Sequence, residues 1–478
     1  MDSLSLVIRE ALEMYDTSKQ FEKFIKDYVV LQGDKQQDLR EQKNKNLERL
    51  KNGLEQYNFD NNTKYAFAET RVQGSMAMNT VVQNDSNDYD IDVAIVFDKA
   101  TIGDIGAYSA RVLVRDALRY KMGQFKEEPE LKTNCVRIKY SDGYHIDFAV
   151  YRRYKEPGDE DYTYEHAGGF SWTRRDPKAI TSWFQSEVKK KGPELRKVVR
   201  LSKMFCKSRS GWVNMPGGLL QSVVCDEVFD NNDSRIDEIF YNTIVAVRDR
   251  LQSTTEVFNP TDTSISLLSA KNHYDKMSNW LSRLSEKIGK LDVLFRTDCN
   301  QEEAYAAWYS FFNHSFWSDI SESVQESFSL EKSFRIKSII SYRDTEEYIE
   351  DQVSCINDKY NVKVQVKVEA NGIRQQLLGD FLRKYPMFRS LIPKGLHIDF
   401  YATTDCPNPD AIWWKVRNVG EYAEMHDEIR GQIIKNAGSH RREYSRFAGP
   451  HFVECYIIKN NECVAITKIH VKIGEASL

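Results

Sequence analysis

Two aspartates at the head of an apolar strand limit what this chain can fold into more than any other feature. Asp90 and Asp92 open the segment Tyr89–Phe97, whose alternation of apolar and polar residues predicts a strand that becomes buried. Residues i and i+2 of a strand share a face, so the two carboxylates lie side by side. Their mutual repulsion requires a cation, and the pattern therefore predicts a metal site on a sheet.

A third acid follows on a later strand. The sequence His-Ile-Asp-Phe occurs at residues 145–148 and again at 397–400, so Asp147 and Asp399 have the same local neighbours. Asp147 follows the first pair by one helix and a hairpin, an interval that lets its strand join the same sheet. We therefore predict Asp90, Asp92 and Asp147 as catalytic metal ligands, and Asp399 as an outward-pointing strand residue.

The predicted ligands are all hard oxygen donors. Such a site suits Mg²⁺, with Mn²⁺ as a substitute, and two ions can promote in-line displacement at a phosphate. Gly74-Ser75, in a turn after the strand-like segment 65–72, can present backbone N–H groups and a hydroxyl to phosphate oxygens. Asp85 and Asp88 are competing acids, but they lie farther from the apolar strand.

Changes in sequence pattern along the chain predict its organisation. Helices are expected over 3–30 and 38–57, mixed helix and strand over 60–155, helices over 172–328, and mostly strands from 395. Ser141-Asp142-Gly143 predicts a hairpin turn. The fold class is α+β, with a catalytic lobe and N-terminal helices at 1–171, a helical lobe at 172–330 and a β-rich domain at 331–478.

Charge and composition exclude several classes of protein. The net charge of −4 excludes a globally basic nucleic-acid binder. Eight cysteines without a CxxC pair predict packed, reduced thiols rather than a zinc cluster or a disulfide framework. With neither a long apolar segment nor a signal or transit peptide expected, we predict a cytoplasmic protein without membrane partners.

The Gly-Ser turn, the aspartate pair and the later acid together resemble the polymerase β-like nucleotidyltransferases. The pattern Gly-Ser, four residues, Thr (here Gly74, Ser75 and Thr80) resembles the bacterial cyclic GMP-AMP synthase-like (CD-NTase) family more closely, with Asn79 where glycine is usual. The resemblance implies a bilobal nucleotidyltransferase that uses two metal ions and binds nucleotide at these three residues.

The helical region carries further matches to the same family. Residues 195–205 look like its RLLKRW-type helix, in which a lysine reaches the triphosphate, and Lys203 is the matching position. Residues 215–220 and 257–260 look like the family's following helix start and turn. The surrounding basic run, 189–209, is open to three interpretations: a solvated face, a polyphosphate site, or a nucleic-acid contact.

The C-terminal region resembles the AGS-C sensor domain of some bacterial defence nucleotidyltransferases. The matching stretches are 413–420, 430–431, Glu443 and 449–459. Six residues among its strands form either a ligand pocket or ordinary core and turn contacts: Trp414, Arg417, Asn418, Arg430, His451 and Glu454. The basic segment around Tyr444 is predicted to be a solvated turn, with a nucleotide-contacting loop as the alternative.

These resemblances imply a function as well as a fold. We predict a template-independent enzyme that joins nucleoside triphosphates into a cyclic oligonucleotide second messenger for antiviral defence. Its partners would be nucleoside triphosphates, a separate effector protein and a ligand of the C-terminal domain. The alternatives are linear, possibly protein-primed, (deoxy)oligonucleotides, a toxin that modifies RNA or protein, and a catalytically inactive binding module.

Overall fold

The chain forms two compact units. The computed structural model describes residues 13–83, 89–120, 128–320, 346–357, 359–370, 372–388, 391–419, 423, 429–446 and 448–477. The first unit comprises the described residues of Met1–Gln32, Leu47–Ala68 and Gln73–Ile336, and the second those of Gly33–Asn46, Glu69–Val72 and Lys337–Leu478. The domain boundaries expected from the sequence remain predictions.

A mixed sheet forms one part of the first unit, except that Glu69–Val72 of its strand β1 belongs to the second unit. Its main strand order is β1-β2-β5-β4-β3, with β6 paired to β5 and β7 to β6. The strands are β1 (Phe67–Gln73), β2 (Asp90–Asp98), β3 (Glu130–Leu131), β4 (Val136–Lys139), β5 (His145–Tyr154), β6 (Thr163–Gly168) and β7 (Ser171–Arg174). β2 and β5 are parallel neighbours, and β4 and β5 form the predicted antiparallel hairpin.

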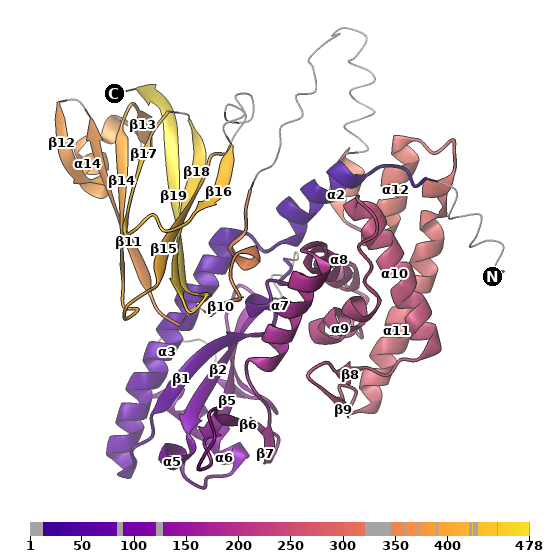
Figure 1. Ribbon diagram of the computed structural model, residues 1–478, viewed down its shortest axis with the longest axis horizontal. Coiled ribbons are helices and arrows are strands. Elements are labelled where there is room, and N and C mark those ends of the chain that lie inside the picture. Colours follow the sequence, from indigo (N-terminus) through magenta and orange to yellow (C-terminus); the bar gives the residue numbers. More distant parts are fainter. Residues whose placement is uncertain are drawn as a thin grey trace. The chain divides into compact units, whose positions relative to one another are not determined.

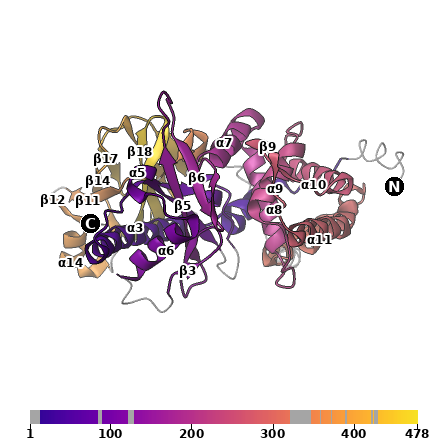
Figure 2. The same ribbon diagram turned by 90° about the horizontal axis from the view of Figure 1, so that it is seen from below.

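Short helices accompany this sheet. They are α4 (Gly74–Ala77), α5 (Lys99–Ile102) and α6 (Ala107–Arg119). α6 is amphipathic and buries Leu113, Val114 and Leu118, and it packs against the strands of the sheet. Figure 2 shows α6 next to this sheet, seen from below. The sheet and α6 form the mixed α/β part expected over residues 60–155, and β6 and β7 extend it beyond that range to Arg174.

Helices form the rest of the first unit (Figure 1). They are α7 (Ala179–Lys191), α8 (Glu194–Lys207), α9 (Gly218–Val228), α10 (Ile236–Ser253), α11 (Lys271–Ile288), the 3₁₀ helix η2 (Gly289–Phe295) and α12 (Gln301–Phe312). The small hairpin of β8 (Phe258–Asn259) and β9 (Asp262–Ser266) joins α10 to α11. A shared apolar core, rich in aromatic pairs around Phe21, Phe240 and Trp308, holds the helices together.

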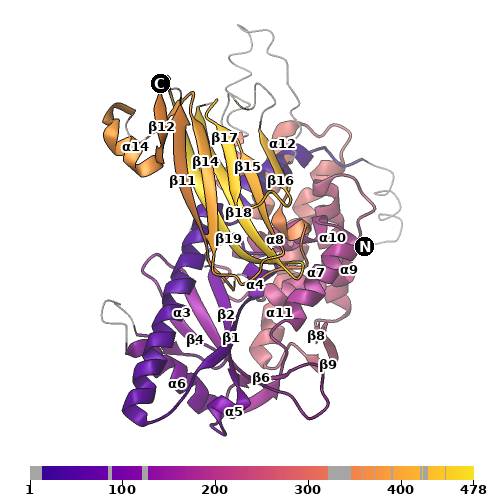
Figure 3. The same ribbon diagram turned by 60° about the vertical axis from the view of Figure 1, so that its left-hand side comes forward.

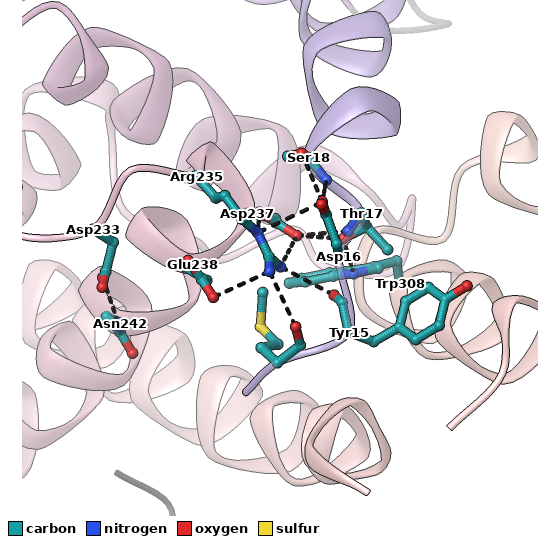
Figure 4. A network of polar contacts seen from close by, with 11 residues as sticks. Tyr15, Asp16, Thr17, Ser18, Asp233, Arg235, Asp237, Glu238, Asn242 and Trp308 are labelled. Atoms are coloured by element: carbon teal, nitrogen blue, oxygen red, sulfur yellow. Dashed lines mark hydrogen bonds and ion pairs between the residues drawn. The ribbon is translucent and has the colours of Figure 1, made fainter. Parts of the chain in front are cut away.

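The N-terminal segment is tied to these helices by buried polar contacts. Helix α2 (Ser18–Phe24) continues as the π-helix η1 (Ile25–Val29), so the helix expected from residue 3 begins, among the described residues, only at Ser18. The fully buried Asp237 accepts hydrogen bonds from the backbone N–H and the hydroxyl of Thr17 at 2.8 and 2.9 Å (Figure 4). Arg235 and the Trp308 indole complete the network. A buried carboxylate is tolerated here because donors surround it.

Helix α3 (Gly33–Asn61) contributes residues to both units. It contains the predicted helix over 38–57 and ends at Asn62, whose φ of 53° places it in the left-handed region. Asparagine tolerates this conformation better than most residues, which explains why the helix ends there.

The second unit is a two-layer β structure (Figure 3). One sheet has the order β10-β19-β18-β15-β16, with β13 paired to β19, and the other has the order β12-β11-β14-β17. Apolar residues from both sheets, including Phe400, Trp414 and Ile457, share one core. The strands are β10 (Cys355–Ile356), β11 (Val362–Ala370), β12 (Ile373–Leu377), β13 (Ile392–Lys394), β14 (His397–Thr404), β15 (Ala411–Arg417), β16 (Arg430–Ile434), β17 (His440–Tyr444), β18 (Gly449–Lys459) and β19 (Glu462–Ser477).

Among the described residues, short helices accompany these strands: η3 (Ile349–Asp351), α14 (Leu378–Lys384) and η4 (Pro386–Phe388). The fold class is therefore as predicted, with a mixed sheet lobe, a helical lobe and a mostly β C-terminal part. Among the described helices, none has the length and apolar character to cross a membrane. The cysteines whose side chains are described are free thiols, most of them buried.

The prediction that Asp399 points outward is wrong. Its side chain is fully buried, accepts hydrogen bonds from His440 Nε2 at 2.8 Å and Gln375 Nε2 at 3.0 Å, and lies 3.7 Å from Arg442 Nε. These donors come from β12 and β17, which flank β11 and β14 in the four-stranded sheet. Local sequence does not reveal that pairing, so the burial was not foreseen.

Candidate active site

A glycine turn forms one wall of the site. At the junction of β1 and α4, Gly74 has a φ of +62°, and a Cβ atom there would lie 2.0 Å from Asp92 Oδ2. Both the left-handed backbone and this contact require glycine. Ser75 follows in α4, and its carbonyl accepts a hydrogen bond from the Thr80 N–H at 2.8 Å. The turn therefore holds its backbone against the first carboxylate strand.

Asn79 explains a departure from the expected motif. Its φ is +52°, so the backbone is left-handed where glycine is usual in the resembled family. Asparagine is one of the few residues that adopt this conformation without severe strain. Asparagine therefore keeps a left-handed backbone at this position; Asp85 and Asp88 lie outside the described residues.

The parallel pairing of β2 and β5 brings the predicted acids together. Asp92 is directly opposite Asp147, and Asp90 is directly opposite His145. All four side chains belong to one face of the sheet because each pair is separated by two positions along its strand. One ligand atom each from Asp90, His145 and Asp147 lies within 4.8 Å of the other two.

The two central carboxylates have opposite electrostatic environments. Burial, together with the charges of Asp90 and Asp147, raises the pKa of Asp92 well above its ordinary value. Burial also acts to raise the pKa of Asp147, but His145 and Arg137 outweigh it and lower that pKa. Arg137 donates to both Asp147 oxygens, from Nε at 2.8 Å and from Nη2 at 2.7 Å.

Arg137 was not singled out from the sequence, although a signal for it existed. It lies directly opposite Asp147 on β4. The predicted hairpin turn at Ser141-Asp142-Gly143 implies this pairing, because residues equally distant from a turn face each other across an antiparallel hairpin. His145 could have been found in the same way, from its spacing of two residues before Asp147.

Lys203 is buried at the helical side of the site. It donates to the carbonyl of Thr80 at 3.0 Å and to its hydroxyl at 2.7 Å. A Cβ atom on Gly218 would lie 2.8 Å from Lys203 Cε, so the glycine of the second helical motif makes room for the lysine. Burial lowers the pKa of Lys203 to about 7, against the attraction of Asp90. An ammonium group has three donors, and Thr80 uses two of them.

The structure divides the basic run 189–209 into separate groups. Lys203, Lys207 and Arg209 line the cavity described next. Lys191 pairs with Asp226 at 2.7 Å, and Lys197 pairs with Glu22 at 2.7 Å. Lys189 and Lys190 are exposed in the last turn of α7. Only part of the run can therefore face a bound polyphosphate.

A single large cavity collects all the residues predicted for the site. Its volume is about 1000 Å³, and its lining includes Gly74, Ser75, Thr80, Asp90, Asp92, Asp147 and Lys203. Aromatic side chains (Tyr89, Tyr151 and Trp212) and cationic side chains (Arg137, Arg175 and Lys207) complete much of the wall. Carboxylates at one place and cations at another suit a ligand that carries both metal ions and phosphates.

The donor set at the acids fits a divalent cation. Burial and the charges of Asp90 and Asp147 raise the pKa of Asp92, and His145 Nδ1 is buried without a hydrogen bond of normal geometry. A cation bound by these groups would compensate the charge and occupy the orphaned nitrogen. Asp90, Asp92, Asp147 and His145 are the residues that could hold it.

The second unit has a smaller pocket of about 290 Å³. Three of the six residues considered for a pocket line it, namely Asn418, Arg430 and His451; Trp414, Arg417 and Glu454 do not. Tyr444 also lines it, at the end of strand β17, so the prediction of a solvated turn for this segment is wrong. Arg430 pairs with Glu443 at 2.7 Å, and this pair closes one side of the pocket.

Family comparisons match each of the two units. Residues 68–151 match the family described as "Cyclic GMP-AMP synthase DncV-like, nucleotidyltransferase domain". Residues 343–474 match "Adenylyl/Guanylyl and SMODS C-terminal sensor domain". The sequence is also similar to a cyclic GMP-AMP synthase of Escherichia albertii, with 24% identity over 421 residues, 85% of this chain and 84% of the relative.

Two solved structures align with part of the chain. The structure of the CdnC:HORMA-deltaN complex of E. coli MS115-1 aligns with a TM-score of 0.48 and 18% identity, covering 63% of this chain and 98% of the other. Vibrio cholerae DncV cyclic AMP-GMP synthase, in complex with the linear intermediate 5′ pppA(3′,5′)pG, aligns with a TM-score of 0.43 and 21% identity, covering 51% and 68%.

Proposed function

We propose that this chain is a CD-NTase that joins a DncV-like nucleotidyltransferase domain to an AGS-C-type sensor domain. It makes cyclic oligonucleotides from nucleoside triphosphates without a template. The E. albertii relative, named a cyclic GMP-AMP synthase, supports cyclisation. The product would act as a second messenger on a separate effector protein in antiviral defence. The sensor domain would bind a ligand of its own.

The observation that carries this proposal is the register of β2 and β5. It places Asp92 beside Asp147, and Asp90 one pair farther along, in the cavity that also contains the Gly74 turn and Lys203. These residues come from distant parts of the sequence, yet they combine acids for metal ions with groups for phosphates. A binding module without catalysis would gain nothing from three mutually repelling carboxylates.

The residues divide the proposed work among them. Asp90, Asp92 and Asp147 would hold two Mg²⁺ ions, or Mn²⁺ in their place, which supply activation of the attacking hydroxyl and charge compensation for the leaving pyrophosphate. Ser75 and the backbone of the Gly74 turn would hold triphosphate oxygens. Lys203 has one donor left beyond Thr80, and a triphosphate would favour its protonated form despite a pKa of about 7.

The size of the cavity supports more than one nucleotide. A volume of about 1000 Å³ is at the upper end of the range for small-molecule sites. Its wall includes the aromatic side chains of Tyr89 and Trp212, beside which we place the bases of the bound nucleotides. An acceptor nucleotide could therefore lie beside the donor, as formation of a linkage requires.

The test is to incubate the protein with all eight labelled ribo- and deoxyribonucleoside triphosphates, with Mg²⁺ or Mn²⁺, and to analyse the products. A cyclic product resists both phosphatase and exonuclease, whereas linear oligomers are degraded by exonuclease. The matched control is the double variant Asp90→Asn, Asp92→Asn, for which we expect no incorporation. Linear products would favour the alternative function, and transfer to RNA or protein would favour the toxin. No incorporation in any of these assays would contradict the proposal.

A further inference from the structure

His145 lies among the carboxylates, although the proposed chemistry so far gives it no role. It is directly opposite Asp90 and two residues before Asp147, so its side chain shares their face of the sheet. Ligand atoms of the three residues lie within 4.8 Å of one another. Opposite ligands of one Mg²⁺ ion are about 4.2 Å apart, so small side-chain movements would bring all three to a single ion.

One imidazole nitrogen of His145 makes no hydrogen bond of normal geometry with the described residues. This Nδ1 atom is buried, and its contact with Asp147 Oδ1, 3.3 Å away, does not have the geometry of a hydrogen bond. The side chain as a whole is only 13% exposed, so water has little access to it. A buried polar atom without a partner is rare in proteins, and such an atom beside carboxylates is placed for a ligand.

The second copy of His-Ile-Asp-Phe shows that the local sequence does not impose this placement. His397 occupies the equivalent position on β14, but its side chain is exposed and its ring lies against Tyr444, with centroids 5.1 Å apart. An acid, Glu369, is opposite His397 as Asp90 is opposite His145. The buried, unsatisfied nitrogen is therefore specific to the first copy.

We propose that His145 is a fourth protein ligand of the divalent cation, binding through Nδ1 together with Asp90 and Asp147, and that this nitrogen gives the site a preference for Mn²⁺ over Mg²⁺. Mg²⁺ takes oxygen ligands almost exclusively, whereas transition-metal ions accept imidazole nitrogen. The inference rests on the proposed function, because it concerns the cation of the same site. It extends that function by assigning a ligand and an ion preference.

The contact of Arg137 with Asp147 is compatible with metal binding. Each Asp147 oxygen accepts one hydrogen bond from Arg137, and a carboxylate has about four acceptor positions in all. A metal ion can therefore use a remaining position while Arg137 fixes the orientation of the carboxylate. Such an orienting contact is typical behind metal-bound carboxylates.

The test uses Mn²⁺ itself as the probe, with the full-length protein and no nucleotide. Pulsed EPR of protein-bound Mn²⁺ should show coupling to a histidine nitrogen, and labelling all histidines with ¹⁵N should change that coupling. His145→Gln should abolish it and weaken Mn²⁺ binding about tenfold or more, while Mg²⁺ binding, measured by competition, changes less than about threefold.

Two control variants make the assignment specific. His397→Gln replaces the matched histidine of the second copy and should leave the coupling and both affinities unchanged. His166→Gln replaces the histidine in the lining of the cavity of about 1000 Å³, whose Nε2 already bonds to the Asn134 carbonyl at 3.0 Å. It should also retain the coupling. Circular dichroism checks that each variant folds. If His145→Gln does not fold, a histidine coupling that persists in His166→Gln still supports the assignment, and the absence of any such coupling from the labelled wild-type protein contradicts it.

The outcomes separate this inference from the proposed function. If bound Mn²⁺ shows no histidine nitrogen, or if His166→Gln rather than His145→Gln removes the coupling, His145 is not a ligand, whatever the enzyme synthesises. If the coupling is present and depends on His145 but no nucleotide is incorporated, the ligand assignment holds and the proposed synthesis fails.

Discussion

The two copies of His-Ile-Asp-Phe, in β5 of the first unit and β14 of the second, have nearly the same local structure. In each copy the three residues after the histidine are buried. Each aspartate also has an arginine directly opposite on an antiparallel neighbour, Arg137 for Asp147 and Arg442 for Asp399. Neither the motif nor one flanking strand distinguishes the two aspartates.

The other flanking strand does distinguish them. Asp147 has Asp92 directly opposite on β2, whereas Asp399 has Lys367 directly opposite on β11. Asp399 also receives hydrogen bonds from Gln375 and His440, so its charge is compensated by protein groups alone. The acid opposite Asp147 leaves a charge that calls for an external cation. The same four residues therefore form a structural contact in one unit and part of a candidate active site in the other.

The largest effect should come from exchanging each aspartate for asparagine. Asp147→Asn removes a predicted metal ligand, and we expect nucleotide incorporation to fall about 100-fold or more, equivalent to roughly 2.7 kcal/mol of barrier. Asp399→Asn should leave the rate within about twofold and instead lower the free energy of unfolding, because it disturbs a buried hydrogen-bonded charge. Incorporation rates and circular dichroism of both variants check this. A folded Asp399→Asn protein without activity, beside an active Asp147→Asn protein, would reverse the assignment.

Replacing Arg137 and replacing Arg442 should both lower the free energy of unfolding, but a metal ion should restore it only for Arg137. Arg137→Gln leaves Asp147 without its cationic partner, and we expect the free energy of unfolding of the metal-free protein to fall by about 2 kcal/mol. Added Mn²⁺ should restore part of that loss, because it supplies positive charge to the same carboxylates. The measurement is urea unfolding with and without Mn²⁺.

Arg442→Gln is the matched control for the arginine prediction. Arg442 lies 3.7 Å from Asp399, which keeps its hydrogen bonds from His440 and Gln375 in the variant. The loss of stability should be smaller, and Mn²⁺ should not reduce it beyond its effect on the wild-type protein. Equal rescue of both variants would mean that the ion acts elsewhere.

Asp92 and Lys367, the residues opposite the two aspartates, offer a test in which a substitution should raise the free energy of unfolding instead of lowering it. Asp92→Asn should raise the free energy of unfolding of the metal-free protein at pH 7 by about 1 kcal/mol, because it removes a buried charge that is repelled by Asp90 and Asp147. The same change should abolish stabilisation by Mn²⁺. Lys367→Gln, at the equivalent position of the second copy, should give no increase. Thermal or urea unfolding of both variants decides, and a loss of metal-free stability in Asp92→Asn would contradict the electrostatic account.

Much of this arrangement could be predicted from the sequence, and the remainder depends on long-range pairing. The aspartate pair, the later acid and the Gly-Ser turn are local patterns, and all of them line one cavity. Both family matches confirm the predicted resemblance. The hairpin turn also implies that Arg137 faces Asp147, although the residue type alone does not point to it. The contact of Lys203 with Thr80, and the burial of Asp399, join segments far apart in the chain, so no local pattern encodes them.

The smallest effect concerns the pH dependence of stability, and its sign follows from the pKa of Asp92. Burial and the neighbouring acids raise this pKa in the folded protein, whereas in the unfolded chain it is about 4. Between these two values the folded state keeps a proton that the unfolded state has lost. The free energy of unfolding of the metal-free protein should therefore decrease as the pH rises above about 4, by about 1 kcal/mol in total up to pH 7, the amount by which Asp92→Asn should stabilise the protein at that pH.

Asp92→Asn should remove that decrease, and Lys367→Gln should retain it, because Lys367 faces the other aspartate. Saturating Mn²⁺ should also oppose the decrease, since deprotonation of Asp92 strengthens ion binding and binding stabilises the folded state. Urea unfolding at a series of pH values, with the metal removed by a chelator and then restored, measures these slopes. Identical slopes for wild type and Asp92→Asn in the metal-free protein would show that the charge opposite Asp147 is already compensated, and that the two copies differ less than their neighbouring strands indicate.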